Sequence, residues 1–359
     1  MKQNTIKIQN ISIGKDCPSF IIAELSANHN GSLKNAINTI KAAKRAGADA
    51  IKLQTYTADT ITIDCKSDDF KIKQGTIWDG TYLYDLYKEA YTPWEWHKEL
   101  FRVAKEEGLI CFSSPFDKTA VDLLEELNTP AYKIASCEIT DIPLIEYVSS
   151  KGKPVIISTG VAGLEDIELA VEACKHMGNE QIILLKCTSS YPAPIEESNI
   201  AMIPDLASRF GVIAGLSDHT TGITLPVVAT VMGAKIIEKH FILDRSIGGP
   251  DASFSLDEQE FTAMVKAVHE AEVAVGKVDY SLTEKMQKSR DFSRSLYVVE
   301  DIKAGDLITE LNVRSIRPGF GLHPKNLNEI VGKKSRIDLA KGTPMKIEYL
   351  ESSSEPFDS

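Results

Sequence analysis

The sequence of 359 residues contains no apolar run that approaches about eighteen consecutive residues, the length that a membrane-spanning helix needs. Its first residues, MKQNTIKIQNISIGKD, also lack the apolar core of a secretory signal peptide. The six cysteines include no CxxC pair, and several lie inside apolar runs, which is typical of buried and reduced thiols. These absences predict a cytoplasmic protein without disulfide bonds or a membrane-spanning helix.

Positive charge is also scarce, since 40 lysines and arginines face 51 aspartates and glutamates and leave a net charge of −11. Such a balance argues against nucleic acid or an anionic membrane as a partner. The hydrophobic content of 43% and the charged content of 25% are ordinary for a soluble globular protein. An anionic substrate would therefore require the protein to gather its few cations into one local site.

One pattern recurs along most of the chain: an amphipathic stretch ends at Gly or Asn, and a short, wholly apolar run follows. Gly and Asn accept the left-handed conformation that ends many helices, so the pattern predicts helices followed by strands. Together with the first run, which no predicted helix precedes, there are eight apolar runs. They lie at residues 20–25, 49–54, 109–114, 131–136, 153–159, 182–187, 212–218 and 234–241. Runs that are apolar throughout suit a parallel sheet covered on its faces. Eight of them predict an α/β protein with a closed (β/α)8 barrel, the TIM barrel.

An open, doubly wound sheet is the alternative architecture. It would more usually have fewer strands and a Gly-rich phosphate loop after the first strand, and the sequence lacks that loop. The composition then changes, and short strands and turns replace the helical pattern. We predict a barrel domain at 1–280, a linker at 281–293, a small β-rich domain at 294–350 and a disordered, Ser-rich tail at 351–359.

Polar side chains follow every one of the eight runs. Active sites of such barrels lie at the carboxyl ends of the strands, where the loops converge. A single polar strand end has no special meaning, but eight together predict an active-site mouth. In chain order, these strand ends carry Glu24 with Asn28 and His29, Lys52 with Gln54, Ser113 with Ser114, Lys133 with Ser136 and Glu138, Ser158 with Thr159, Thr188 with Ser189 and Tyr191, Ser217 with Asp218 and His219, and Glu238 with Lys239 and His240.

Two lysines, Lys52 and Lys133, lie inside apolar runs, where an unpaired ammonium group would be costly. A structural ion pair would explain them, and so would a Schiff-base lysine of an aldolase. Binding of a phosphate or carboxylate is the better interpretation, because hydroxyl residues flank both lysines and an acidic protein needs local cations for an anion.

Two histidines, His219 and His240, end adjacent predicted strands, so that their rings can share one centre. This arrangement favours a divalent metal ion with few protein ligands, a site suited to polarising a substrate carbonyl. His29 is a weaker candidate, since it lies in a polar turn before a helix.

The motifs at these strand ends resemble those of sialic acid synthases over nearly the whole chain. They are FIIAELSANHNGS, IKLQT, SSPF, AYKIASCE, STG, LKCTSSYPAP, GLSDHT, EKHF and GGPDASFS. The segment with IRPGFG and GKK is similar to the antifreeze-like (SAF) domain that closes the chains of this family. Within the family, the aromatic segment at 78–96, WDGTYLYDLYKEAYTPWEW, resembles the pseudaminic acid synthase branch.

The resemblance implies a transferase that condenses phosphoenolpyruvate with an amino-sugar aldehyde and releases phosphate by C–O cleavage. The acceptor implied by the branch is 2,4-diacetamido-2,4,6-trideoxy-altrose, for use in flagellin or surface glycans; synthesis of N-acetylneuraminate or legionaminate is the alternative. Schiff-base or metal aldolase activity, and a sugar-binding protein without catalysis, remain as rivals from other classes.

The resemblance also implies roles for individual residues. His219 and His240 would bind Mn²⁺, Co²⁺ or Mg²⁺, and Glu24 and Glu138 would be catalytic carboxylates. A homodimer is implied, in which Arg317 of one SAF domain reaches the other chain's site. The remaining substrate contacts would come from Lys133, Ser136, Ser189 and Ser217 for the phosphate, Lys52 and Ser114 for the carboxylate, and Tyr191 and Asp251 for the sugar. Ser189 and Ser114 depart from the Asn and Thr that the family often has there, but keep a hydrogen-bonding group.

Overall fold

The computed structural model describes residues 5–73 and 75–351. The chain divides into two compact units between Gly276 and Lys277. The predicted tail lies outside the described residues, apart from its first residue. All six cysteines are free thiols, and no helix among the described residues is long and apolar enough to cross a membrane.

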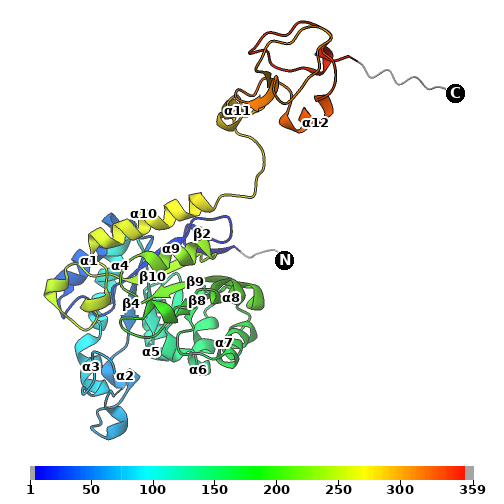
Figure 1. The fold of residues 1–359 in the computed structure, drawn as a ribbon. Helices are drawn as coiled ribbons and strands as arrows, with labels where there is room; N and C mark the ends of the chain where they lie inside the picture. Colours follow the sequence, from blue (N-terminus) through cyan, green and yellow to red (C-terminus); the bar gives the residue numbers. More distant parts are fainter. Residues whose placement is uncertain (1–4, 74, 352–359) are drawn as a thin grey trace. The chain divides into compact units, whose positions relative to one another are not determined.

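The first unit is a closed barrel of eight parallel strands surrounded by helices (Figure 1). The strands follow one another in chain order around the barrel, and the last pairs with the first, with His240 opposite Glu24. All eight predicted strands are confirmed, and closure of the sheet excludes the open alternative. They are β3 (Phe20–Glu24), β4 (Ala50–Thr55), β5 (Ile110–Pro115), β6 (Tyr132–Ile134), β7 (Val155–Ser158), β8 (Ile182–Cys187), β9 (Ile213–Asp218) and β10 (Ile236–His240).

The helices of this unit begin and end at residues whose chemistry favours these positions. The side chains of Asp117 and Asp257 accept backbone N–H groups at the starts of α5 and α10. Gly211 and Asn128, two of the predicted helix ends, have φ values of 68° and 55°. The helices around the barrel are α1 (Leu33–Arg45), α4 (Trp94–Glu106), α5 (Lys118–Glu126), α6 (Ile142–Ser149), α7 (Leu164–His176), α8 (Met202–Phe210), α9 (Thr224–Val231) and α10 (Glu258–Val275).

Side chains alternate along each strand between the helices outside and the interior of the barrel. On β4, Ile51 and Leu53 pack in the outer core, whereas Ala50 packs with the interior group. The same interior group contains Ile6, Ile8 and Ile13 of a short hairpin, β1 (Ile6–Ile8) with β2 (Ile11–Ile13). This hairpin, which the sequence analysis did not predict, fills the floor of the barrel with apolar side chains.

A long segment joins β4 to α4 and carries two short helices, α2 (Ala58–Ile61) and α3 (Leu83–Ala90), together with a 3-10 turn, η1 (Asp68–Phe70). Helices α2 and α3 contact each other at one side of the barrel (Figure 1). An isolated bridge pairs Lys71 with Tyr82, so that the chain between them forms a hairpin-like loop.

The second unit has an antiparallel pair of strands, β11 (Ser295–Val298) and β12 (Val313–Ile316), and a small apolar core that includes Leu296, Ile308 and Ile330. Its helices are short: α11 (Glu284–Arg290), which lies within the predicted linker, and α12 (Leu327–Ile330). Arg317 follows β12 and is exposed on this unit.

Candidate active site

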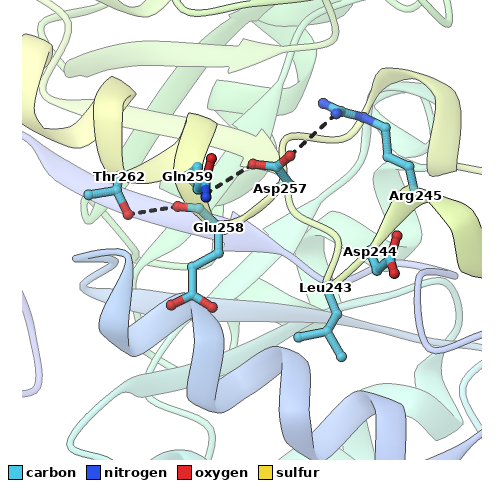
Figure 2. A pocket seen from close by; sticks show the side chains of 7 residues that line it. All are labelled: Leu243, Asp244, Arg245, Asp257, Glu258, Gln259 and Thr262. Atoms are coloured by element: carbon cyan, nitrogen blue, oxygen red, sulfur yellow. Dashed lines mark hydrogen bonds and ion pairs between the residues drawn. The ribbon is translucent and has the colours of Figure 1, made fainter.

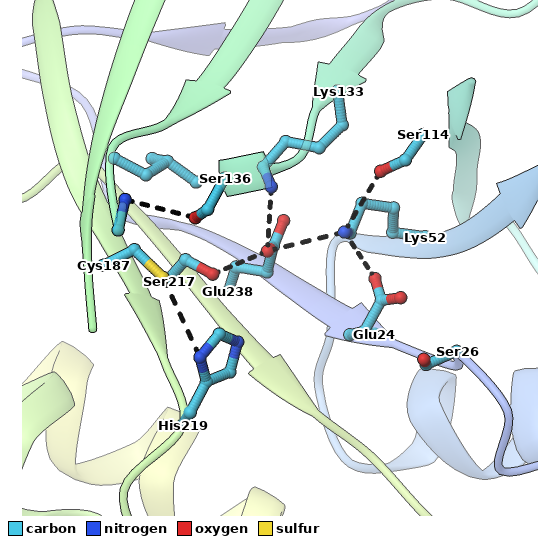
Figure 3. Close-up of polar contacts among 12 residues, drawn as sticks. Glu24, Ser26, Lys52, Ser114, Lys133, Ser136, Cys187, Ser217, His219 and Glu238 are labelled. Atoms are coloured by element: carbon cyan, nitrogen blue, oxygen red, sulfur yellow. Dashed lines mark hydrogen bonds and ion pairs between the residues drawn. The ribbon is translucent and has the colours of Figure 1, made fainter. Parts of the chain in front are cut away.

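Four charged side chains lie in one layer inside the barrel: Glu24, Lys52, Lys133 and Glu238, none of which is more than 4% exposed. Each occupies an inward position near the carboxyl end of its strand, where the alternation that buries Ala50 also turns Lys52 inward. Figure 3 shows both lysines directed toward Glu238, with Glu24 and Ser114 beside Lys52. Four charges can remain buried here because each faces an opposite charge.

Glu238 lies at the centre of this layer. Its Oε1 is 3.5 Å from Lys52 Nζ and 3.4 Å from Lys133 Nζ, and it accepts a hydrogen bond of 2.8 Å from Ser217 Oγ. Burial alone would raise the pKa of Glu238, but Lys133 and Lys52 outweigh it and lower the pKa to about 2. Glu238 therefore stays ionised and holds both ammonium groups in place. From the sequence alone, Glu238 is one polar strand end among eight, next to His240, and its contacts with the lysines cannot be predicted.

The two lysines differ in how well their charges are compensated. Lys52 Nζ also lies 2.8 Å from Glu24 Oε2 and donates to Ser114 Oγ at 3.4 Å. Burial would lower the pKa of Lys52, but Glu238 and Glu24 outweigh it and raise the pKa. For Lys133 burial dominates, and its pKa is lowered although Glu238 opposes the change. Lys133 thus contacts one carboxylate where Lys52 contacts two, and an anion bound beside Lys133 would favour its charged form.

Two carboxyl groups of the site, Glu24 and Glu138, can exchange protons near neutrality. Burial raises the pKa of Glu24 to about 7, although Lys52 opposes the shift, and its Oε1 accepts a hydrogen bond from Gln54 Nε2. Burial likewise raises the pKa of Glu138 to about 7. Glu138 ends the turn η2 (Ser136–Glu138), and its Oε2 is buried without a hydrogen-bond partner among the described residues. Such groups suit general acid–base work at neutral pH.

Hydroxyl groups gather around Gly160, two residues after the end of β7. The Gly160 N–H donates to Ser136 Oγ at 3.2 Å. A Cβ atom at position 160 would lie 2.1 Å from Ser189 Oγ and 2.8 Å from Ser136 Oγ, so only glycine leaves these hydroxyls where they are. Cys187 Sγ lies 3.8 Å from Ser189 Oγ, in the same cluster.

The rings of His219 and His240 lie 5.3 Å apart at the ends of β9 and β10. Burial and the nearby His219 hold the pKa of His240 well below its usual range, so its imidazole is neutral. His240 Nδ1 is buried, has no hydrogen-bond partner among the described residues, and lies 3.8 Å from Asp251 Oδ2. A neutral imidazole with an unsatisfied nitrogen is a suitable metal ligand.

His219 has closer partners. Its Nδ1 is 3.0 Å from the Thr188 carbonyl and 3.8 Å from Cys187 Sγ (Figure 3). Burial would raise the pKa of Cys187, but His219 outweighs it and lowers the pKa to about 6. Across residues 5–73 and 75–351, no group of three or more His, Cys, Asp or Glu side chains is placed to hold a metal ion. Two imidazoles alone are fewer ligands than a complete metal site has, and although burial would lower the pKa of His219, Cys187 outweighs it and raises that pKa.

Aromatic rings border the two histidines. The Tyr191 ring lies 4.3 Å from that of His219 and 5.2 Å from that of Phe254. Burial raises the pKa of Tyr191 well above its usual value, so its phenol keeps its proton. Asp251 accepts a hydrogen bond from the Ala27 N–H at 3.2 Å, which fixes the carboxylate beside His240.

The sequence profile of the NeuB family matches residues 39–280, and that of the SAF domain matches residues 293–349. The chain belongs to the NeuB family. The resemblance to sialic acid synthases with a terminal SAF domain is thereby confirmed.

This NeuB-family chain is 50% identical over 327 residues to a pseudaminic acid synthase of Campylobacter jejuni. The aligned residues make up 91% of this chain and 95% of that protein. The pseudaminic acid synthase of Helicobacter pylori is 46% identical over 337 residues, 94% of this chain and 99% of its own. Among solved structures, N-acetylneuraminic acid synthetase of Leptospira borgpetersenii, in complex with citrate, matches with a TM-score of 0.72 at 32% identity, over 80% of this chain and 95% of that one.

In the NeuB-family barrel most of the predicted site residues lie around the layer and the two histidines. His29 does not join them, because its Nδ1 accepts the Gly31 N–H and its ring packs edge-on against Trp96. Ser113 faces outward and bonds Thr55. Arg317 belongs to the second unit.

A hollow of about 860 Å³ at the start of α10 is separate from this site (Figure 2). Its polar groups already satisfy one another, since Asp257 accepts the Gln259 N–H, Thr262 donates to the Glu258 carbonyl, and Arg245 pairs with Asp257. The hollow contains none of the predicted site residues and supports no function.

Proposed function

We propose that this NeuB-family protein is a pseudaminic acid synthase, which condenses phosphoenolpyruvate with 2,4-diacetamido-2,4,6-trideoxy-altrose and releases phosphate by C–O cleavage. The observation that carries the proposal is the buried layer of Lys52, Lys133 and Glu238 in a chain 50% identical to a curated pseudaminic acid synthase. Schiff-base chemistry uses a desolvated lysine with a lowered pKa, so borohydride trapping on Lys133 distinguishes it from the proposed reaction, in which no covalent adduct forms on Lys133.

Phosphoenolpyruvate suits the site because it carries a phosphate and a carboxylate. In the proposal, Lys133 and the hydroxyls of Ser136, Ser189 and Ser217 hold the phosphate, and Lys52 with Ser114 holds the carboxylate. The support is the single carboxylate contact of Lys133 and the convergence of the Ser136 and Ser189 hydroxyls beside Gly160. The same fixed cations accept the phosphate as it leaves, without any reorganisation.

In the proposal, Glu24 and Glu138 act as the general acid and general base of the reaction. As the new C–C bond forms, the aldehyde oxygen gains a proton, and the attacking water loses one before C–O cleavage. A carboxyl group with a pKa near 7 exists in both protonation states at neutral pH, which both directions of transfer require. Tyr191 and Asp251 lie beside the histidines and would contact the sugar.

His219 and His240 would hold a divalent metal ion, Mn²⁺, Co²⁺ or Mg²⁺. When bound, such an ion supplies Lewis-acid polarisation of the aldehyde oxygen. The support from this chain is the neutral imidazole of His240 with its unsatisfied Nδ1.

We extend the proposal to a cytoplasmic homodimer in which Arg317 of one chain completes the other chain's site. Arg317 is exposed, and its guanidinium fork can bind a carboxylate or amide oxygen in two places. Inactive Arg317→Ala protein mixed with inactive Lys133→Ala protein is expected to regain activity, because one of the two sites in a mixed dimer receives both native residues. The regained activity is measured as phosphate release. If subunit exchange is demonstrated and no activity returns, Arg317 does not act in the other chain's site.

A phosphate-release assay across three sugars, with saturating phosphoenolpyruvate, tests the proposed function directly. We expect kcat/KM for the diacetamido-trideoxy-altrose to exceed that for N-acetylmannosamine by roughly two orders of magnitude or more, as sites built for particular polar groups achieve. The third sugar is the precursor of legionaminate. A higher kcat/KM for N-acetylmannosamine or the legionaminate precursor would instead assign the neuraminate or legionaminate reaction.

A further inference from the structure

The loop between Lys71 and Tyr82 holds one tryptophan, Trp78, in a defined position. Asp79 organises the loop, because its carboxylate accepts the N–H groups of Gly75 at 3.0 Å and Thr76 at 2.9 Å. The Trp78 N–H donates to Thr76 Oγ1 at 3.3 Å, and its carbonyl accepts the Thr81 N–H. Trp78 therefore belongs to an ordered turn.

This turn reaches the active site through Tyr191. The rings of Trp78 and Tyr191 lie 5.5 Å apart, and the Tyr191 ring in turn lies 4.3 Å from that of His219. The loop after β4 and the loop after β8 thus meet next to the histidines. A cavity of about 440 Å³ lies between them, lined by residues 75–77 and 189–192.

The indole of Trp78 has an unused donor. Its Nε1 is buried and has no hydrogen-bond partner among the described residues. By contrast, Trp94 Nε1 donates to the Tyr56 carbonyl at 3.1 Å. A buried donor without a partner is unfavourable, so a ligand oxygen that accepts this N–H is stabilised.

We propose that Trp78 selects the acceptor sugar by donating its Nε1–H to the carbonyl oxygen of the acetamido group at C4. The inference rests on the proposed function and names the residue behind its sugar preference. In the proposed complex the acetamido group at C2 would lie beside the aldehyde and the histidines, and the acetamido group at C4 would lie on the side of Tyr191 that faces Trp78. A hydroxyl group at C4 is shorter than an acetamido group and does not reach the indole.

The test compares Trp78→Phe, which keeps a ring but removes the N–H, with Trp94→Phe as the matched control. Each enzyme is assayed with the 2,4-diacetamido sugar and with its analogue that has a hydroxyl at C4. For Trp78→Phe we expect KM for the diacetamido sugar to rise about tenfold with little change in kcat, as the loss of one hydrogen bond predicts. The preference for the diacetamido sugar over the analogue should fall by the same factor.

Trp94→Phe loses a hydrogen bond inside the protein, so it should lower the melting temperature and leave the preference unchanged. An unchanged preference in Trp78→Phe, or an equal loss in both variants, overturns the inference and leaves the proposed function standing. A wild-type enzyme that prefers N-acetylmannosamine overturns both.

If Trp78→Phe does not fold, NMR of the wild-type protein still tests whether the Trp78 indole contacts the sugar. The chain has three tryptophans, so substitution of Trp94 and Trp96 assigns the remaining indole ¹⁵N–H resonance to Trp78. That resonance should shift when the diacetamido sugar is added to the complex with phosphoenolpyruvate in the presence of a chelator, which prevents turnover, and not with the C4-hydroxyl analogue. Equal shifts with both sugars contradict the inference.

Discussion

Replacement of Lys133 by methionine is expected to lower kcat/KM for phosphoenolpyruvate roughly a thousandfold, through weaker binding and slower turnover. Within the charged layer, Lys133 contacts one carboxylate, Glu238, whereas Lys52 contacts both Glu238 and Glu24, so Lys133 is the cation better able to pair with the incoming phosphate. Loss of one partner from a buried charge contact costs about 2–5 kcal/mol, which corresponds to this factor. Phosphate-release kinetics and calorimetric titration with phosphoenolpyruvate measure the effect.

The matched control is Lys186→Met. Lys186 is also a buried lysine near a strand end, but it lies between the inward residues Leu185 and Cys187 and donates to the Cys187 carbonyl. Its replacement should change KM for phosphoenolpyruvate by less than about threefold. If the Lys133→Met protein kept wild-type affinity for phosphoenolpyruvate, Lys133 would not be part of the anion site. Lys52 and Ser217 still hold Glu238, so the variant should fold.

Alanine at His219 or His240 should abolish metal binding and reduce turnover by about a thousandfold or more, since Lewis-acid assistance supplies several kcal/mol. Chelation of the wild-type enzyme should have the same effect, and Mn²⁺, Co²⁺ or Mg²⁺ should restore activity. Metal content by elemental analysis and affinity by calorimetry provide readouts that do not depend on turnover.

His97 offers a matched control for the loss of a buried imidazole. Its Nε2 lies 2.8 Å from Thr55 Oγ1 and its Nδ1 3.2 Å from the Pro93 carbonyl, so both nitrogens have partners outside the site. His97→Gln should melt at a lower temperature and keep both metal and activity. Full turnover by the metal-stripped wild type would exclude a catalytic metal.

The barrel could be predicted from sequence because its signals are local. Each helix end at Gly or Asn and each apolar run depends on neighbouring residues alone, and closure of eight such strands follows from their number. The site could be predicted to the level of strand ends for the same reason. Inward lysines such as Lys52 stand out, because charge is unusual in an apolar run.

Two features depend on contacts that local sequence does not record. The strands β1 and β2 have three residues each, too short for an alternating pattern, and their place in the fold is set by the interior of the barrel. The role of Glu238 depends on Lys133 of β6, which is distant in sequence and meets Glu238 only across the closed barrel. The open donor of Trp78 similarly requires two loops to meet.

The β1–β2 hairpin fills one end of the barrel with apolar side chains. A substrate would therefore enter from the other end, where the carboxyl ends of the strands lie. Glu238 precedes His240 by two positions on the same strand, and Ser217 likewise precedes His219, so these two polar side chains lie deeper in the barrel than the histidines. A molecule bound at the layer then has the sugar above it, between itself and the solvent. If the proposed placement holds, we expect phosphoenolpyruvate to bind before the sugar, and the sugar acid to leave before the phosphate. The expected order of binding and release thus follows from how deep in the barrel each binding group lies.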